Sequence, residues 1–416
     1  MTLIKQNRFF RDRLEHLKEH NLHRCLRAFQ GEQGPWIELD GRHVLNLCSN
    51  NYLGLASHNK VKEATATAVR YYGCSSGASR LICGTMDIHE CLEKQLAIFK
   101  GKEAALLYST GYNANVGIIS SLVGRGDIVF SDELNHASLV DGCRLSRATV
   151  NVFPHNNMDA LEERLHRACE VNQEGQRLIV VDGVFSMDGD IAPLPRLADL
   201  AEKYEASVMV DEAHATGTLG PGGRGSVAYF GLDERIPIIM GTMGKALGGF
   251  GAFVAGSQEL REFLINTSRS FIFTTALPPA VTASAIAALE VLKSDQGLVA
   301  RLQDNAQYLR QKLRELGFNT LHSQTQIMPV VIGDAGLTYR MSELLLEENV
   351  LATAIRPPTV PEGTSRIRVS VMATHTIDDL NHAVRAFEKA GRALGILGGG
   401  PRSLSLKSCA KWGSDQ

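Results

Sequence analysis

The sequence predicts an α/β fold in which a large domain with a mostly parallel sheet is joined to a smaller C-terminal α+β domain. The chain has 416 residues, more than one hydrophobic core usually organises. Its middle alternates short apolar runs with helical patterns, which is typical of a parallel sheet covered on both faces. From about residue 295 the pattern becomes mixed. The expected parts are an N-terminal helix and segment, a large domain, a small domain and a flexible tail, with boundaries 1–55, 56–294, 295–397 and 398–416.

The N-terminal segment is charged throughout and has no apolar signal-peptide core. Phe10, Leu14 and Leu17 recur at helical spacing, which predicts an amphipathic docking helix. The 20 uncharged residues of 270–289 do not predict a membrane span, because Pro278 and Pro279 interrupt them. They indicate a loop followed by a helix that the prolines begin.

Composition narrows the class of protein. The chain has 44% hydrophobic and 21% charged residues and a net charge of −2, which argues against nucleic acid or a membrane surface as partner. Small molecules or a second copy of the chain fit better. The eight cysteines fit neither a zinc ribbon nor a disulfide framework, so we expect reduced, mostly buried thiols and a cytoplasmic protein.

Three apolar runs of strand length define the predicted parallel sheet. The three runs are 177–185, 206–214 and 236–242. A helical pattern over 193–205 lies between the first two. Asp182, Asp211 and Lys245 fall at or just after the carboxyl ends of the three runs. Open α/β sheets bind ligands at that edge, so we expect these side chains to converge on one site.

The small domain begins with a long amphipathic pattern over residues 298–318. A strand pattern over 327–334, a second helix and another strand pattern over 365–371 follow. This order is an α+β arrangement.

Three motif matches are better explained as structural features than as functional sites. VDEAH (210–214) resembles a helicase acidic box, but no G-x-x-x-x-G-K-[ST] phosphate loop accompanies it. GPGGRG (220–225) follows no strand and contains a proline, so a glycine-rich turn is expected. Asp211 with His214, and Asp132 with His136, have metal-ligand spacing, but such pairs are mostly structural and no metal is expected.

Lys245 has the surroundings of a lysine that carries a cofactor. The stretch 238–257 places it among glycines and contains no Asp or Glu. Small neighbours leave room for a planar adduct, and loss of charge in a Schiff base removes the cost of burial. Pyridoxal phosphate forms such an adduct and needs an acid at its ring nitrogen, a role that suits Asp211. Thr242 and the helix start in YSTGYNAN (108–115) can bind the phosphate, and His136 can stack on the ring.

With these features in place, the chain resembles the α-oxoamine synthase family of fold-type I pyridoxal-phosphate enzymes over nearly all of residues 10–395. The motifs that carry the resemblance occur in order and are SNNYLGL (49–55), LNHASLVDG (134–142), DGVFSMDGD (182–190), VDEAHATGTLGPGGRGS (210–226) and GTMGKALGG (241–249). Together they are far more specific than any one alone.

The resemblance implies a role for each matched residue. Lys245 resembles the Schiff-base lysine, Asp211 the partner of the pyridinium nitrogen, and His136 the ring-stacking residue that also assists catalysis. His214 matches the residue that binds the phenolic oxygen of the ring. The other cofactor contacts implied are Gly111, Tyr112, Ser186, Thr242, Thr274 and Thr275. The last two match contacts from a second subunit, which implies a homodimer with shared active sites.

Simpler explanations stay open for some of these positions. Ser186 could cap a turn, His136 could be a core histidine, and Thr274 could be a loop hydroxyl. Arg24 and Arg356, discussed next, could be solvated surface arginines.

TAIRPPTVPEGTSRIRV (353–369) bears on the substrate. It resembles the biotin-pathway branch, an acyltransferase that condenses L-alanine with a pimeloyl thioester of CoA or acyl carrier protein and releases carbon dioxide. In this branch Arg356 would bind the amino-acid carboxylate, and Arg24, Asn50 and Thr359 would lie at the substrate. The freed Lys245 amine would remove the Cα proton.

Other functions stay open. The segments 82–93 and 386–397 resemble a branch that joins glycine to acetyl-CoA. A serine-using branch is a further alternative. A non-enzymatic binding protein would require the loss of Lys245 or Asp211, and both are present.

Overall fold

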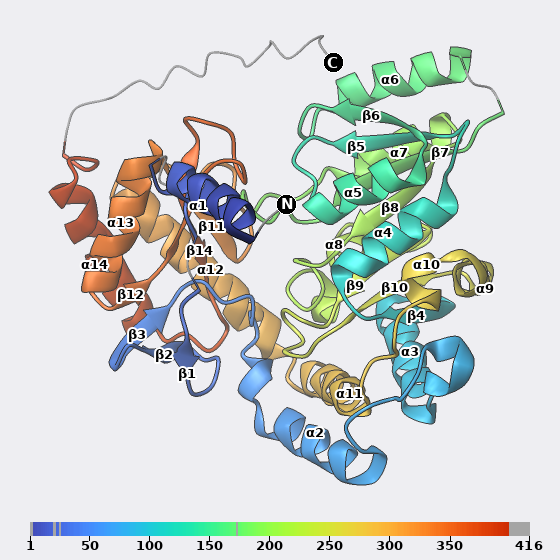
Figure 1. Cartoon of the computed structure of the whole chain (residues 1–416), viewed down its shortest axis with the longest axis horizontal. Helices are drawn as coiled ribbons and strands as arrows, with labels where there is room; N and C mark the ends of the chain where they lie inside the picture. The colour runs from blue at the N-terminus through green and yellow to red at the C-terminus, as the bar shows by residue number, and fades with distance from the viewer. Residues whose placement is uncertain (1–2, 20–21, 25, 172–173, 399–416) are drawn as a thin grey trace.

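The computed structural model describes residues 3–19, 22–24, 26–171 and 174–398 (Figure 1). A large body with a central sheet holds the green, cyan and yellow elements, and a second body holds the orange C-terminal elements. The blue strands of the N-terminal segment lie beside these orange elements, which come from the other end of the chain.

The central sheet of the large body has seven strands. In spatial order they are β4 (Ala104–Tyr108), β10 (Ala252–Gly256), β9 (Ile238–Thr242), β8 (Ser207–Asp211), β7 (Arg177–Asp182), β5 (Ile128–Asp132) and β6 (Thr149–Phe153). β10 alone runs antiparallel to both of its neighbours. The other paired strands are parallel, which confirms the prediction of a mostly parallel sheet.

Both faces of the sheet are buried by helices. Leu178 and Val180 of β7 belong to an apolar cluster with α4 and α5, whereas Ile179 and Val181 pack with α6 and α7. Each fully buried Val, Leu or Ile contributes about 1.5–3 kcal/mol. The helices of this body are α2 (Asn59–Tyr72), α3 (Asp87–Lys100), α4 (Gly111–Leu122), α5 (Ala137–Ser146), α6 (Met158–Val171), α7 (Leu194–Lys203), α8 (Ser226–Tyr229), α9 (Gln258–Thr267), α10 (Arg269–Ile272) and α11 (Pro279–Ser294). Pro278 and Pro279 begin α11, as the sequence predicts.

The second body combines three helices with two small sheets. Its elements are α12 (Gly297–Glu315), β11 (Ile327–Gly333), α13 (Ala335–Glu347), β12 (Val350–Leu351), β13 (Thr353–Ile355), β14 (Ser365–Ser370) and α14 (Ile377–Ala393). β14 pairs with β11 and β13. β12 extends a sheet formed by β1 (Phe29–Gln30), β2 (Trp36–Leu39) and β3 (Arg42–Asn46). This pairing of the two ends of the chain was not expected, and the domain boundaries stay a prediction.

The N-terminal helix α1 (Leu3–Glu19) confirms the helical periodicity. Phe10, Leu14 and Leu17 form an apolar stripe that this chain leaves exposed. Docking of this helix stays a prediction.

The prediction of mostly buried thiols is wrong for the part of the chain that the structure describes. Cys143 is buried, but Cys74, Cys83 and Cys91 are exposed. Cys74 and Cys83 lie on the connections between α2 and α3, and Cys91 on the outer side of α3.

Two further findings concern the described residues. No helix among them is long and apolar enough to cross a membrane. No three His, Cys, Asp or Glu side chains within these ranges are grouped so that they could hold a metal ion.

Candidate active site

The ends of β7, β8 and β9 form the site that the sequence predicts. Asp182 and Asp211 are paired across β7 and β8, and Lys245 follows the end of β9 by three residues. The turn that carries Lys245 is held by Thr242, whose hydroxyl donates to the Gly251 carbonyl (2.8 Å) and accepts from the Gly244 N–H (3.1 Å).

Glycine is required in this turn. Gly248 has a φ of +63°, and a Cβ placed there would lie 2.3 Å from the Ala56 nitrogen. The glycines of the motif therefore let the Lys245 turn pass close to the backbone at Ala56.

Lys245 lies next to His214. Its Nζ is 2.9 Å from Nε2 of His214, and Nδ1 of the same ring is 2.7 Å from the Tyr52 hydroxyl. The Tyr52 hydroxyl donates to Oδ1 of Asn50 (2.9 Å), so His214 Nδ1 carries the ring proton and Nε2 accepts from Lys245. Burial lowers the pKa of His214 well below its usual range, and the charge of Lys245 adds to this effect.

Burial also lowers the pKa of Lys245 to about 8, although the charges of Asp211 and Asp182 act in the opposite direction. About a tenth of this amine is therefore uncharged at pH 7, far more than for an exposed lysine, and the uncharged form can act as a base or a nucleophile.

Asp211 is fixed by two hydrogen bonds. Its Oδ1 accepts from the Ala213 N–H (2.8 Å), and its Oδ2 accepts from the Asn115 amide (2.7 Å). The same amide nitrogen donates to the Ser138 hydroxyl (2.8 Å), which lies 2.7 Å from Nδ1 of His136. Two buried polar side chains, Asn115 and Ser138, therefore join Asp211 to the more exposed His136.

A small cavity of about 290 Å³ opens over these groups. Its lining includes Lys245, His136, His214, Asn50, Ser186 and Arg368. Arg368 comes from β14 of the second body, and it donates to the Ser186 carbonyl (2.7 Å) and to Oδ1 of Asn50 (3.3 Å). The Lys245 site therefore lies where the two bodies meet, with a cation provided by the smaller one.

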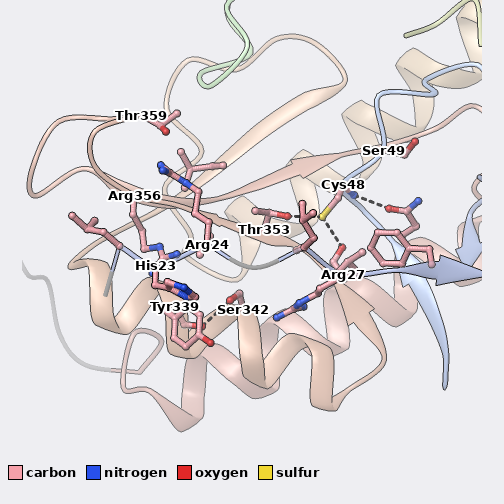
Figure 2. Close-up of a pocket in the computed structure, with 18 of the residues that line it drawn as sticks. His23, Arg24, Arg27, Cys48, Ser49, Tyr339, Ser342, Thr353, Arg356 and Thr359 are labelled. Carbon is pink, nitrogen blue, oxygen red and sulfur yellow. Dashed lines mark hydrogen bonds between the residues drawn. The ribbon is translucent and has the colours of Figure 1, made fainter. Parts of the chain in front are cut away.

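A second cavity of about 700 Å³ adjoins the first. Cys48, Thr353 and Ile355 line both. Figure 2 shows that Arg24 and Arg356 lie in this larger cavity near Tyr339, with Cys48 and Thr353 toward the other side. The Arg356 guanidinium lies 5.1 Å from the centre of the Tyr339 ring, an attractive cation–π arrangement.

This larger cavity is suited to an anion. Arg27, Lys18 and His23 line it together with Arg24 and Arg356, and no Asp or Glu is among its lining residues. Thr359 lies in the same wall.

The predicted residues fall into three groups. The first group lines the small cavity and comprises Lys245, His214, His136, Ser186 and Asn50. Asp211 lies behind this lining and is joined to His136 through Asn115 and Ser138. The second group, Arg24, Arg356 and Thr359, lines the large cavity. The third group lines neither cavity of this chain and comprises Gly111, Tyr112, Thr242, Thr274 and Thr275.

Members of the third group have other contacts. Gly111 and Tyr112 begin α4, whose first N–H groups have no acceptor within the helix. The Tyr112 side chain is exposed and its hydroxyl donates to Asp141. Thr275 bridges to Ser79.

Sequence reasoning missed Tyr52, Asn115 and Arg368. Tyr52 lies inside SNNYLGL and Asn115 inside YSTGYNAN, so both belong to motifs that predict the site. Arg368 lies two residues after Arg366 in a strand where side chains alternate, and nothing local distinguishes the two arginines.

Comparison with known proteins agrees with this geometry. A model of the family described as "Aminotransferase class I and II" matches residues 42–387. Among the curated relatives, the 8-amino-7-oxononanoate synthase of Geobacter sulfurreducens is 54% identical over 386 residues, covering 92% of this chain and 98% of that protein. The enzyme of the same name from Thermoanaerobacter pseudethanolicus is 47% identical and covers 95% of this chain and 100% of its own.

Solved structures are also similar. Serine palmitoyltransferase from S. paucimobilis, with pyridoxal phosphate and myriocin bound, has a TM-score of 0.89 at 33% identity, with coverage of 95% of this chain and 100% of that chain. An 8-amino-7-oxononanoate synthase from Francisella tularensis has a TM-score of 0.72 at 28% identity, covering 84% and 98%.

Proposed function

The chain belongs to the aminotransferase class I and II family, and we propose that within this family it is a pyridoxal-phosphate acyltransferase of biotin synthesis. The proposed reaction joins L-alanine to a pimeloyl thioester, releases the thiol and carbon dioxide, and gives 8-amino-7-oxononanoate. The observation that carries this proposal is the pair of adjoining cavities, one around Lys245 and one lined by arginines. The names of the curated relatives support the same reaction.

The residues around Lys245 fit pyridoxal phosphate. A lysine with a lowered pKa faces the small cavity, Asp211 is a buried acid for a ring nitrogen, and His136 and His214 are polar groups for the ring. The start of α4 can receive a phosphate. When bound, pyridoxal phosphate supplies an electron sink for the bond to Cα that breaks.

The side chains of this protein would bind and orient the amino acid and move its proton. Lys245, uncharged in part near neutral pH, would take the Cα proton and later return one. His214 accepts a hydrogen bond from Lys245 and thereby fixes the direction of the amine.

Arg368 is the better candidate for the amino-acid carboxylate, a role that the family resemblance implies for Arg356. Arg368 lies in the same small cavity as Lys245, together with Asn50. Arg356 lines the larger cavity instead. Two arginines in two cavities suit a substrate pair that carries two carboxylates, one on the alanine and one at the far end of the pimeloyl chain.

Arg356→Ala is expected to raise KM for pimeloyl-CoA by about 10- to 100-fold, the range for losing a hydrogen bond to a charged group. Heptanoyl-CoA, of equal chain length but without the carboxylate, should show little change in KM. Steady-state kinetics with both thioesters provide the measurement. An equal loss with both would place Arg356 outside carboxylate recognition.

Coupling of pyridoxal phosphate to the cofactor-free protein is expected to become faster as pH rises through about 8. The reason is that the uncharged Lys245 amine attacks the aldehyde, and burial lowers the pKa of Lys245 from 10.5 to about 8. An exposed lysine would show the same rise near 10.5. Stopped-flow absorbance between pH 6 and pH 10 records the rate, and a rate that kept rising up to pH 10 with no midpoint near 8 would contradict the lowered pKa.

We also propose a cytoplasmic homodimer whose subunits share residues. Leu81, Ile82 and Phe273 are exposed apolar side chains near the Ser79–Thr275 bridge, and a second copy would cover them. Thr274 and Thr275 would then reach the phosphate of the neighbouring site.

The experiment that tests the function is thiol release by protein loaded with pyridoxal phosphate. L-alanine with pimeloyl-CoA should react much faster than glycine with acetyl-CoA, and mass spectrometry should detect 8-amino-7-oxononanoate. Faster release with the second pair would keep the cofactor chemistry but assign the protein to the glycine-using branch.

A further inference from the structure

Asp182 is the one member of the predicted trio of Asp182, Asp211 and Lys245 that the proposed mechanism does not use. It is buried, with 3% of its surface exposed, at the end of β7. Its strand partner is Asp211, so two carboxyl groups end neighbouring strands. Without a specific task, a second buried acid at this place would be costly.

The contacts of Asp182 lead to His136. Oδ2 of Asp182 accepts from the backbone N–H of His136 at 2.6 Å. The backbone N–H of Asp182 donates to Oδ1 of Asn135, whose amide nitrogen also donates to the Val180 carbonyl (2.7 Å). The segment that carries His136 is therefore fastened to β7 by consecutive residues, 135 and 136.

His136 is held at its ring as well. It caps α5, with Nδ1 accepting from the Ser138 N–H (3.3 Å) and lying 2.7 Å from the Ser138 hydroxyl. The ring faces the small cavity. Asp182 therefore fixes the backbone and Ser138 the ring of the residue that would lie against the cofactor.

We propose that Asp182 is a positioning residue that sets the place of His136 over the cofactor, and that it acts as a hydrogen-bonding group without a net negative charge. The inference rests on the proposed function, because the cofactor gives His136 its task. Two adjoining buried carboxylates repel each other. The Asp211 carboxylate accepts from two donors and the Asp182 carboxyl from one, so Asp182 is the one better suited to hold a proton. Burial, followed by the charge of Asp211, raises the pKa of Asp182 well above its usual range, in agreement.

The test uses two replacements of one residue. Asp182→Ala removes the acceptor and should weaken pyridoxal phosphate binding and turnover by about ten-fold each, with a reduced visible circular dichroism of the bound cofactor. Asp182→Asn reproduces the acceptor and donor of a neutral carboxyl and should recover both quantities to within about three-fold of the unchanged protein. Asp199→Ala, an exposed acid on α7, serves as the control.

A double-mutant cycle separates positioning from a general effect on folding. If Asp182 acts through His136, then Asp182→Ala should cost little more in a His136→Ala background than His136→Ala costs alone. Additive losses would overturn the proposal, and so would an Asp182→Asn variant as impaired as Asp182→Ala.

Crystal structures of the two Asp182 variants, determined without a cofactor, would show whether Asp182 fixes the position of His136. His136 should move in Asp182→Ala and stay in Asp182→Asn. An unmoved His136 in the alanine variant would overturn the inference even if the protein proved not to bind pyridoxal phosphate. Absence of cofactor binding by the unchanged protein would refute the proposed function separately.

Discussion

Lys245→Ala is expected to lower turnover by at least about 10³-fold, because it removes both the group that carries the cofactor and the base that takes the Cα proton. The Lys245 amine, which we propose for both roles, lies 2.9 Å from His214 Nε2 and has a pKa lowered to about 8 by burial. Lys245→Arg should be as inactive, because a guanidinium neither forms the covalent link nor loses its proton near neutral pH.

Two measurements make this result specific. The loaded protein should lose the visible absorbance of lysine-bound pyridoxal phosphate, and thiol release should fall in parallel. Lys203→Ala, at an exposed lysine paired with Glu162, should change neither. Retention of more than about a tenth of the turnover in Lys245→Ala would remove Lys245 from the proton transfer, since general bases contribute about 10²–10⁴-fold.

The parallel sheet and the convergence of charges at its edge could be predicted because both follow from local patterns. Apolar runs of strand length and helical crossovers imply that strand ends meet, and this places Asp182, Asp211 and Lys245 together without knowledge of any contact. His214 could be predicted at the same site, because it lies three residues after Asp211 in the same turn. The distance from Lys245 Nζ to His214 Nε2 could not be predicted, but their proximity could.

The sequence could not predict which side chain the second body adds to the small cavity. Arg368 reaches the small cavity only because β14 lies between β11 and β13 and faces the large body, which is a tertiary fact. Arg366, on the same strand, pairs with Asp188 instead. The motif that contains Arg356 likewise gives no indication of which cavity its side chain lines, and that cavity is the larger one.

Local sequence patterns also could not predict the buried polar side chains that hydrogen-bond to the site residues. Asn115 connects Asp211 with Ser138 across a helix and a strand, and no spacing along the chain encodes that connection. Tyr52 meets His214 from a segment 162 residues earlier. Side chains of this kind become visible only when each buried donor and acceptor is followed to its partner.

Asp211→Asn and Asp182→Asn make the same chemical change at neighbouring positions of β8 and β7, and opposite results are expected. Asp211→Asn should lower turnover by about 10²–10³-fold, the usual effect of removing one preorganised electrostatic partner, because an amide cannot hold a ring nitrogen protonated. The fold should persist, since rotation of the Asn115 amide would offer its Oδ1, which has no partner among the described residues, to the new amide.

Comparing the two variants therefore distinguishes the effect of losing a negative charge from the effect of changing the side chain, at two buried acids of one site. Turnover, the absorbance of the bound cofactor and thermal unfolding would be recorded for both variants under identical conditions. If Asp182→Asn lost as much turnover as Asp211→Asn, the negative charge would have to be shared by both carboxyl groups, and the assignment of the ring-nitrogen partner to Asp211 alone would fail. If only Asp211→Asn lost turnover while both kept their thermal stability, Asp211 would be the charged acid of the site and Asp182 its neutral neighbour.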